Sequence, residues 1–215
     1  MSGDGDRPFA DREDAGRRLG AALAERGIDP DVVLAIPRGG LPLGRAVADA
    51  LDAPLDVIVA RKMGAPHNPE FAIGAAAADG SVHINEAAIE RHGVDTEYVE
   101  RARESAAEEA REKAARYRDG DAVPDLADAA VVIVDDGVAT GATARACIAQ
   151  ARAAGAARVV LAVPVGSPRT VSALESVADG VVCPEAPPEF RAVGQFYERF
   201  DQVSDEEAMA YLTDG

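Results

Sequence analysis

The chain has 215 residues, 47% of them hydrophobic and 28% charged, which is enough to bury the core of one globular domain. Its 22 basic and 38 acidic residues give a formal net charge of −16, which excludes long-range attraction to nucleic acids and anionic membranes. The sequence lacks both an apolar run of about 18 residues and the order of a signal peptide, so we expect a cytoplasmic protein without a membrane span.

The first part of the chain predicts a β-α-β unit. Asp11 is a candidate N-cap for a helix that ends at Gly27. Residues 32–36 are wholly apolar and predict a strand that is buried on both faces. A short helix over about 41–51 then connects this strand to a second one over 55–60.

The middle of the chain is more polar. Residues 61–70 are rich in proline and polar side chains and predict a long mobile loop. Residues 71–78 and 81–84 flank Asp79-Gly80 and predict a hairpin. Residues 95–117 predict a helix that carries many opposite charges, which we interpret as exposed to solvent.

The second half returns to alternating strands and helices. Residues 131–134 predict another buried strand, followed by a helix that ends before Gly155. Residues 158–163 and 181–182 predict two further strands, and Ser204 begins a C-terminal helix. The alternation predicts an α/β fold whose open, mostly parallel, twisted sheet is flanked by helices, with ligands bound beyond the carboxyl ends of the strands.

The protein's own side chains predict no metal site. Cys147 and Cys183 lie far apart and form no CxxC motif, which indicates free thiols in a reducing compartment. The three histidines, His67, His83 and His92, do not have the spacing of zinc ligands.

Two carboxylates, Asp135 and Asp136, end the predicted strand 131–134, and a Gly/Thr loop then opens a helix. Backbone N–H groups at a helix N-terminus bind phosphate, and the hydroxyls of Thr140 and Thr143 add donors. A vicinal acidic pair is well suited to accept hydrogen bonds from two ribose hydroxyls. The alternative is an acidic turn that only caps the helix.

A second motif, Pro37-Arg38-Gly39-Gly40, follows the first predicted strand. Glycine allows the backbone to approach a ligand closely, and the arginine guanidinium can bind two phosphate oxygens at once. Alone this motif indicates no more than a turn. Its position at the carboxyl end of a strand, one β-α-β unit before Arg61-Lys62, favours a phosphate site.

The tail gathers the aromatic side chains of a chain that has only five Phe, four Tyr and no Trp. Four of them lie within residues 188–200, namely Phe190, Phe196, Tyr197 and Phe200. Such a cluster is suited to stacking on a flat base. A small hydrophobic core is the alternative for each ring, and both interpretations stay open.

These motifs resemble those of the type I phosphoribosyltransferases. VVIVDDGVATGAT resembles the family signature for phosphoribosyl pyrophosphate (PRPP), and PRGG resembles its pyrophosphate loop. FADREDAGRRL, RKMGAPHNPEFAIGA and PPEFRAVGQFYERFDQ extend the resemblance to a subgroup of stand-alone members. The resemblance implies transfer of the 5-phosphoribosyl group from PRPP to a nitrogenous acceptor such as a nucleobase, with Mg²⁺ bound mainly through PRPP, in a homodimer.

The resemblance also implies roles for individual residues of a single domain over 1–215. The PRPP-binding set is Asp135, Asp136, Gly137, Val138, Ala139, Thr140, Gly141, Ala142 and Thr143. The pyrophosphate-binding set is Pro37, Arg38, Gly39, Gly40, Arg61 and Lys62. The acceptor-binding set, in a hood over 183–203, is Phe190, Val193, Phe196 and Tyr197. The catalytic set is Arg38, Lys62 and Glu70.

Ala139 departs from the 6-oxopurine members, which carry an acidic proton carrier at this place. Glu70 is then the candidate for acid–base chemistry, with a simple surface glutamate as the alternative. A second class of function also stays open, in which the chain binds PRPP or a nucleotide as a regulator without catalysis. A regulator of this kind would normally add a basic, nucleic-acid-binding surface, for which this acidic chain offers no separate region.

The basic residues are almost all arginine, since only Lys62 and Lys113 are lysines. An acidic, lysine-poor surface is typical of halophilic proteins, in which salt screens the repulsion between surface carboxylates. A GC-rich genome, which favours alanine and arginine over lysine, would produce the same composition.

Salt dependence of stability separates these two explanations. We expect the melting temperature to rise between dilute buffer and molar KCl, because a net charge of −16 repels itself most strongly when it is unscreened. Thermal unfolding followed by circular dichroism measures this, with molar sorbitol as a control for general solute effects. A melting temperature that does not change with KCl would leave genome composition as the explanation.

Overall fold

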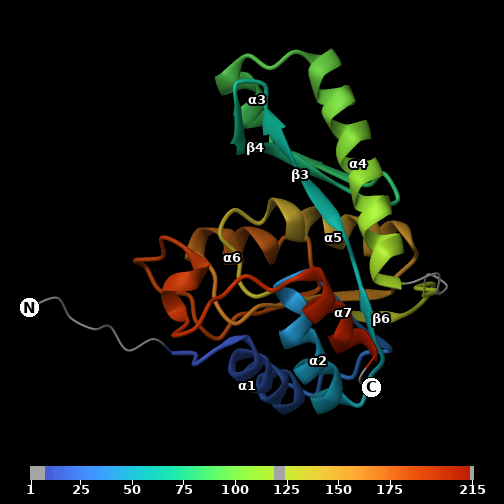
Figure 1. Ribbon diagram of the computed structural model, residues 1–215, viewed down its shortest axis with the longest axis vertical. Helices are drawn as coiled ribbons and strands as arrows, with labels where there is room; N and C mark the ends of the chain where they lie inside the picture. Colours follow the sequence, from blue (N-terminus) through green and yellow to red (C-terminus); the bar gives the residue numbers. More distant parts are fainter. Residues whose placement is uncertain (1–7, 119–123, 214–215) are drawn as a thin grey trace, which may run out of the picture.

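The computed structural model describes residues 8–118 and 124–213. At its centre is a sheet of five parallel strands in the order β2-β1-β6-β7-β8 (Figure 1). Its strands are β1 (Val32–Ala35), β2 (Leu55–Val57), β6 (Ala130–Val134), β7 (Arg158–Ala162) and β8 (Gly180–Val182). The predicted α/β fold with a parallel sheet between helices is confirmed.

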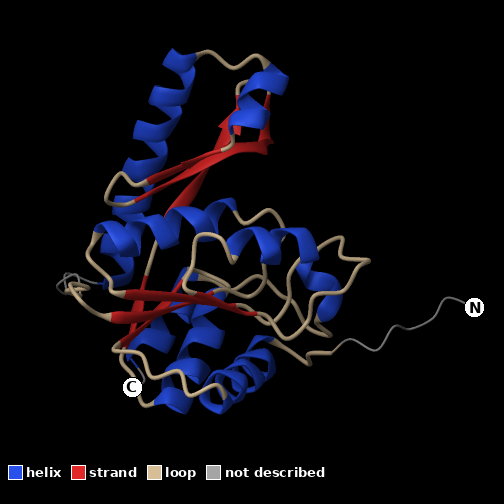
Figure 2. Cartoon of the chain, turned by 180° about the vertical axis from the view of Figure 1, so that it is seen from behind, coloured by secondary structure: helices blue, strands red, loops and turns tan. Residues whose placement is uncertain are grey.

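Helices cover both faces of the central sheet (Figure 2). They are α1 (Arg12–Glu25), α2 (Gly40–Leu51), α5 (Ala142–Ala153) and α6 (Pro168–Leu174). Val33 and Val132 are buried against α1 and α2, whereas Leu34 and Ile133 are buried on the side of α5. Because successive residues of a strand point to opposite faces, burial on both sides explains why these strands are wholly apolar.

A second sheet of three antiparallel strands lies beyond α5 (Figure 1). This part comprises β3 (Ala60–Ala65), β4 (Asn68–Ala77), β5 (Val82–Ile84), α3 (Glu86–His92) and α4 (Thr96–Arg118). Ala75 and Ala77 of β4 share a hydrophobic core with Cys147 and Ile148 of α5, so α5 lies between the two sheets. The long helix α4 runs from the second sheet back toward the central one (Figure 1).

The prediction of a mobile loop over 61–70 is wrong. These residues form β3 and the start of β4, which pair antiparallel, and only the turn at Pro66 keeps the expected character. Met63 and Ala65 are buried together with Ile73 in a core that α3 and α4 close. The polar composition of the segment concealed these alternating buried positions.

The helix predicted over 95–117 is α4, but it is exposed on one face only. Ala110, Ala114 and Tyr117 are buried along its other face. Alanine gives a weak periodic signal, so the arginines and glutamates dominated the prediction. The strand predicted over 55–60 is also shorter than expected, because β2 ends at Val57 and Ala60 already belongs to the second sheet.

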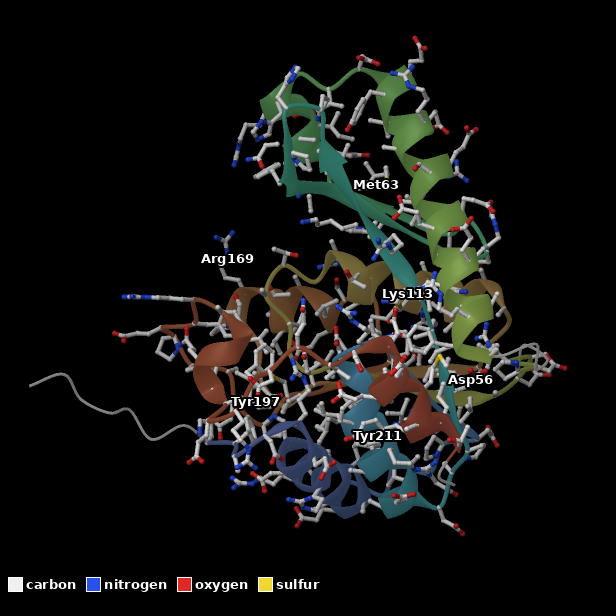
Figure 3. The ribbon with its side chains drawn as sticks, in the orientation of Figure 1. Asp56, Met63, Lys113, Arg169, Tyr197 and Tyr211 are labelled. Atoms are coloured by element: carbon white, nitrogen blue, oxygen red, sulfur yellow. The ribbon has the colours of Figure 1, made fainter. Side chains whose placement is uncertain are left out.

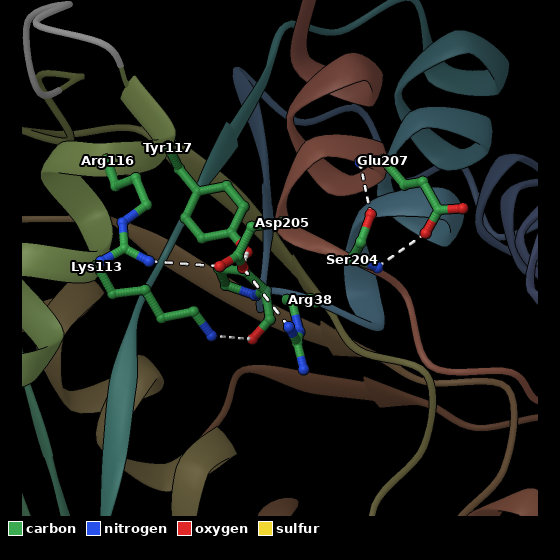
Figure 4. Close-up of polar contacts among 8 residues, drawn as sticks. Arg38, Lys113, Arg116, Tyr117, Ser204, Asp205 and Glu207 are labelled. Carbon is green, nitrogen blue, oxygen red and sulfur yellow. Dashed lines mark hydrogen bonds and ion pairs between the residues drawn. The ribbon is translucent and has the colours of Figure 1, made fainter.

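Several predicted local signals are confirmed. Asp11 caps α1, where its carboxylate accepts the N–H of Asp14 at 2.9 Å. Ser204 precedes α7 (Asp205–Thr213) and exchanges two hydrogen bonds with Glu207, of 2.8 and 3.1 Å (Figure 4). Cys147 and Cys183 are free thiols.

None of the helices in the described ranges has the length and apolar character needed to cross a membrane.

The close packing of α1 on α2 gives a test of the fold. A Cβ at Gly16 would lie 2.8 Å from the Cα of Leu43, which cannot yield as a side chain would. We expect Gly16→Ala to lower the free energy of unfolding by about 1–3 kcal/mol, because this overlap outweighs the roughly 1 kcal/mol of helix propensity that alanine adds. Urea unfolding measures the change. Ala21→Gly on the exposed face of α1 measures the propensity difference alone, and a Gly16→Ala protein as stable as wild type would contradict the packing.

Candidate active site

The two sequence motifs meet at the carboxyl edge of the central sheet. They follow β1 and β6, which are neighbours paired from Val32 with Val131 to Ala35 with Val134. A Cβ at Gly39 would overlap the Asp136 carboxylate, and one at Gly40 would lie 2.7 Å from the Val134 carbonyl oxygen. These two glycines therefore allow the loops to touch. The peptide bond between Pro37 and Arg38 in the first loop is cis.

The acidic pair is half-buried where the loops meet. Burial raises the pKa of the Asp135 carboxyl well above its usual value, and the negative charge of Asp136 raises it further. Burial also raises the pKa of Asp136, but the guanidinium of Arg12 opposes this shift. Two adjacent carboxylates in this position favour a ligand that presents hydroxyl donors or a cation.

Arg12 is a functional candidate that the sequence did not reveal. Its Nε donates to Oδ2 of Asp136 at 2.9 Å, and its Nη1 donates to the carbonyl of Asp201 at 2.6 Å. Its guanidinium also lies 3.9 Å from the centre of the Phe200 ring. A sequence signal did exist, because a cation in the first turn of a helix is unfavourable unless something else binds it.

Tyr197 holds the same loop from the other side. Its hydroxyl donates to the carbonyl of Asp136 at 2.6 Å, and its ring is fully buried beside Phe9 (Figure 3). The N–H of Phe9 donates to the carbonyl of Phe196, so the two terminal segments pair next to the site. A ring with no exposed surface cannot stack on a base, so of the two interpretations the structure favours the hydrophobic core for Tyr197.

The other residues of the expected acceptor set are partly exposed. The rings of Phe190 and Phe196 stack on each other, with their centres 5.6 Å apart and their planes inclined by 18°. Val193 touches the loop after β6, since a Cβ at Gly137 would lie 2.6 Å from its Cγ1. The segment over 183–203 thus lies against the acidic loop, with two stacked rings close by.

The rest of the loop after β6 is held by backbone contacts. Val138 donates its N–H to Val165 at 2.9 Å, and the hydroxyl of Thr170 donates to the carbonyl of Ala139 at 2.6 Å. Gly141 is the N-cap of α5 and has a φ of 76°, a conformation that favours glycine. Thr140 is exposed and Thr143 half-buried at this helix N-terminus, where the first N–H groups have no acceptor within the helix. The arrangement can bind a phosphate.

A basic cleft of about 400 Å³ opens beside the first loop. It is lined by Arg38, Arg61, Glu109, Glu112, Lys113, Arg116 and Asp205. Four cations and three carboxylates thus share this cleft, which gives it a small net positive charge in a protein whose net charge is −16. Lys113 and Arg116 come from α4, and the sequence did not indicate that this helix reaches the site.

The structure separates the remaining predicted residues. Arg61 lines the basic cleft and pairs with Glu109 at 2.9 Å, whereas Lys62 is exposed and is not among the lining residues. Neighbouring residues of a strand point to opposite faces, which explains the separation. Glu70 lies in β4 rather than in a loop, and its side chain falls outside what the structure describes.

Comparisons with known proteins point to one family. A family model described as phosphoribosyl transferase domain matches residues 10–200. A Mycobacterium tuberculosis protein that is provisionally named a phosphoribosyl transferase is 45% identical over 205 residues, which cover 95% of this chain and 46% of that protein. This chain therefore spans about half the length of the curated relatives that it matches.

Solved structures agree with the family match. The crystal structure of TT1426 from Thermus thermophilus is 42% identical with a TM-score of 0.80, and the match covers 95% of this chain and 97% of that one. The AQ2163 protein from Aquifex aeolicus shares the fold at 12% identity and a TM-score of 0.50, with 94% and 85% of the two chains covered.

The contact between Arg12 and Asp136 generates a prediction. Their side chains are only 12% and 17% exposed, so Arg12→Gln leaves a carboxylate without its cation in a site that excludes most water. We expect the free energy of unfolding to fall by about 2 kcal/mol or more, as measured by urea unfolding at pH 7. Arg18→Gln removes an exposed ion pair of the same helix and should change stability by less than about 1 kcal/mol. Equal effects of the two substitutions would contradict a structural role for Arg12.

Proposed function

Because this chain belongs to the phosphoribosyl transferase domain family, we propose that it transfers the 5-phosphoribosyl group of PRPP to a nitrogenous acceptor and releases pyrophosphate. One observation carries the proposal. An acidic pair, a helix N-terminus and a basic cleft adjoin one another along the carboxyl edge of the sheet. PRPP presents the three matching groups, because its ribose hydroxyls lie between a 5-phosphate and a diphosphate.

Each part of this edge is suited to one part of the substrate. The carboxylates of Asp135 and Asp136 would accept hydrogen bonds from the two ribose hydroxyls. The 5-phosphate would bind at the N-terminus of α5, where residues 139–143 offer N–H and hydroxyl donors. The diphosphate would bind beside Pro37-Arg38-Gly39-Gly40, in reach of the basic cleft.

The reaction would break the bond between the anomeric carbon and the diphosphate. Positive charge then develops on the ribose ring and negative charge on the departing diphosphate. The cations and backbone N–H groups that already surround the diphosphate stabilise this charge without having to reorganise, and such preorganisation is usually the largest contribution to catalysis. Exclusion of water from the reacting centre would limit hydrolysis of PRPP.

The resemblance implies Mg²⁺, and the donor set permits it in a limited way. In the described ranges no three His, Cys, Asp or Glu side chains form a metal-binding group. The chain would offer the carboxylates of Asp135 and Asp136, while diphosphate oxygens and water would supply the remaining ligands that Mg²⁺ prefers. When bound, the ion would neutralise part of the charge on the diphosphate.

For the acceptor we propose a nucleobase bound under the hood over 183–203. Phe190 and Phe196 are partly exposed and stacked, and Val193 touches the loop that would hold the ribose. Aromatic rings in this position can stack on a flat base. Since Ala139 cannot carry a proton, Glu70 stays the proposed acid–base residue, although its place in a strand removes the argument from a mobile loop.

The acidic pair provides the test. We expect Asp135→Asn combined with Asp136→Asn to lose PRPP binding, because an amide accepts hydrogen bonds less strongly than a carboxylate does. Calorimetry with PRPP and Mg²⁺ measures affinity, and pyrophosphate release over a panel of purines, pyrimidines and amines measures turnover. Glu97→Gln with Glu100→Gln on the exposed face of α4 is the control for two lost charges.

The outcomes separate an enzyme from a binding protein. Wild-type affinity for PRPP in the double Asn variant would contradict the ribose role of Asp135 and Asp136. PRPP binding in the wild-type protein without turnover on any acceptor would instead favour a regulatory protein that binds PRPP.

A further inference from the structure

Helix α4 brings a lysine to the first loop of the site. Nζ of Lys113 donates to the carbonyl of Pro37 at 3.0 Å, across 76 positions of sequence (Figure 4). This carbonyl immediately precedes Arg38, so the ammonium lies next to the segment proposed to bind the diphosphate. An ammonium has three N–H donors, and the Pro37 carbonyl uses one of them.

The cleft that Lys113 lines contains both charges, because three guanidiniums and three carboxylates share its walls. Burial lowers the pKa of Lys113, and the nearby guanidiniums of Arg61 and Arg38 lower it further, while Asp205 and Asp135 act in the opposite direction. The cations that converge in this cleft repel one another, and an anion bound between them would reduce this repulsion. Because acidic residues outnumber basic ones by 38 to 22 in this chain, a cluster of four cations is a notable feature of its surface.

The chain places one of its own carboxylates against these cations. Asp205 begins α7, and its carboxylate accepts the hydroxyl of Tyr117 at 2.6 Å (Figure 4). The same carboxylate lies 3.3 Å from a guanidinium nitrogen of Arg116 and 3.8 Å from one of Arg38. Two guanidiniums and a hydroxyl directed at one carboxylate form a site that an oxyanion can occupy.

It is also informative that position 113 holds a lysine and not an arginine. The chain has 22 basic residues, and lysine occurs only at 62 and 113. A compact ammonium can donate to the Pro37 carbonyl and to a phosphate oxygen at once, whereas the planar guanidinium directs its donors in a fixed fork.

We propose that Lys113 is a diphosphate-binding residue supplied by α4, and that a bound diphosphate replaces the Asp205 carboxylate as partner of the cations. The identification of this diphosphate with the leaving group of PRPP rests on the proposed function. The diphosphate would then be bound by α4 in addition to the loop after β1.

Calorimetric titration with inorganic pyrophosphate and Mg²⁺ tests the role of Lys113. We expect Lys113→Gln, which removes the charge but keeps an N–H donor for Pro37, to weaken pyrophosphate binding at least about tenfold. Lys113→Arg, which keeps the charge, should recover part of the affinity. Arg101→Gln removes a charge from the exposed face of the same helix and should bind like wild type. Melting temperatures verify that each variant is folded.

Removing the charge of Asp205 should have the opposite effect on pyrophosphate affinity. We expect Asp205→Asn to bind pyrophosphate about threefold to tenfold more tightly, because the competing charge is gone. Glu206→Gln, an exposed neighbour on α7, controls for the loss of one negative charge. Equal tightening in both variants would overturn the replacement of Asp205 by the diphosphate.

Wild-type pyrophosphate affinity in Lys113→Gln would overturn its binding role. If Lys113→Gln weakens pyrophosphate binding while the wild-type protein turns over no PRPP, the inference stands and the proposed function fails. If the wild-type protein turns over PRPP while Lys113→Gln binds pyrophosphate normally, the proposed function stands and the inference about Lys113 fails.

Discussion

Two adjacent carboxylates at the end of a buried strand are the constraint on which the site depends. Asp135 and Asp136 repel each other and are partly removed from water, so their charge has to be compensated. Arg12 supplies a cation from the start of α1, and the buried Tyr197 fixes the backbone of the same loop. Both come from the ends of the described chain, so the terminal segments and the central loop form one unit.

At the basic cleft the charges are reversed, and cations are compensated by a carboxylate. There the cations of the first loop and of α4 converge, and the Asp205 carboxylate from α7 lies among them. The site therefore contains an internal cation for its carboxylates and an internal anion for its cations. A substrate that carries hydroxyls next to a diphosphate would meet both halves, and this separation of charge allows a strongly acidic protein to offer a place for a polyanion.

The second sheet contributes to the site by supporting α4. Its apolar residues, such as Met63 and Ile73, pack against Ala107 of α4 and support this helix from one side. Ala110 and Ala114 of α4 pack toward the central sheet together with Tyr117. The helix thus links the two sheets, and this link places Lys113 and Arg116 at the loop after β1.

The sequence by itself determined the parallel character of the central sheet, the order of its strands and helices along the chain and the two loops at its carboxyl edge. Wholly apolar strands and glycine-rich turns are local signals, because burial on both faces and close backbone approach restrict the residues at each position. The sequence also predicted the hairpin over 71–84 that β4 and β5 form, but it missed β3 and the start of β4, where single buried residues such as Met63 stand among polar neighbours. Arg12, Lys113, Tyr197 and Asp205 acquired their roles only from the tertiary structure. Each acts on a partner far away in the chain, and a charge or hydroxyl in sequence does not reveal which partner folding will bring within hydrogen-bonding distance.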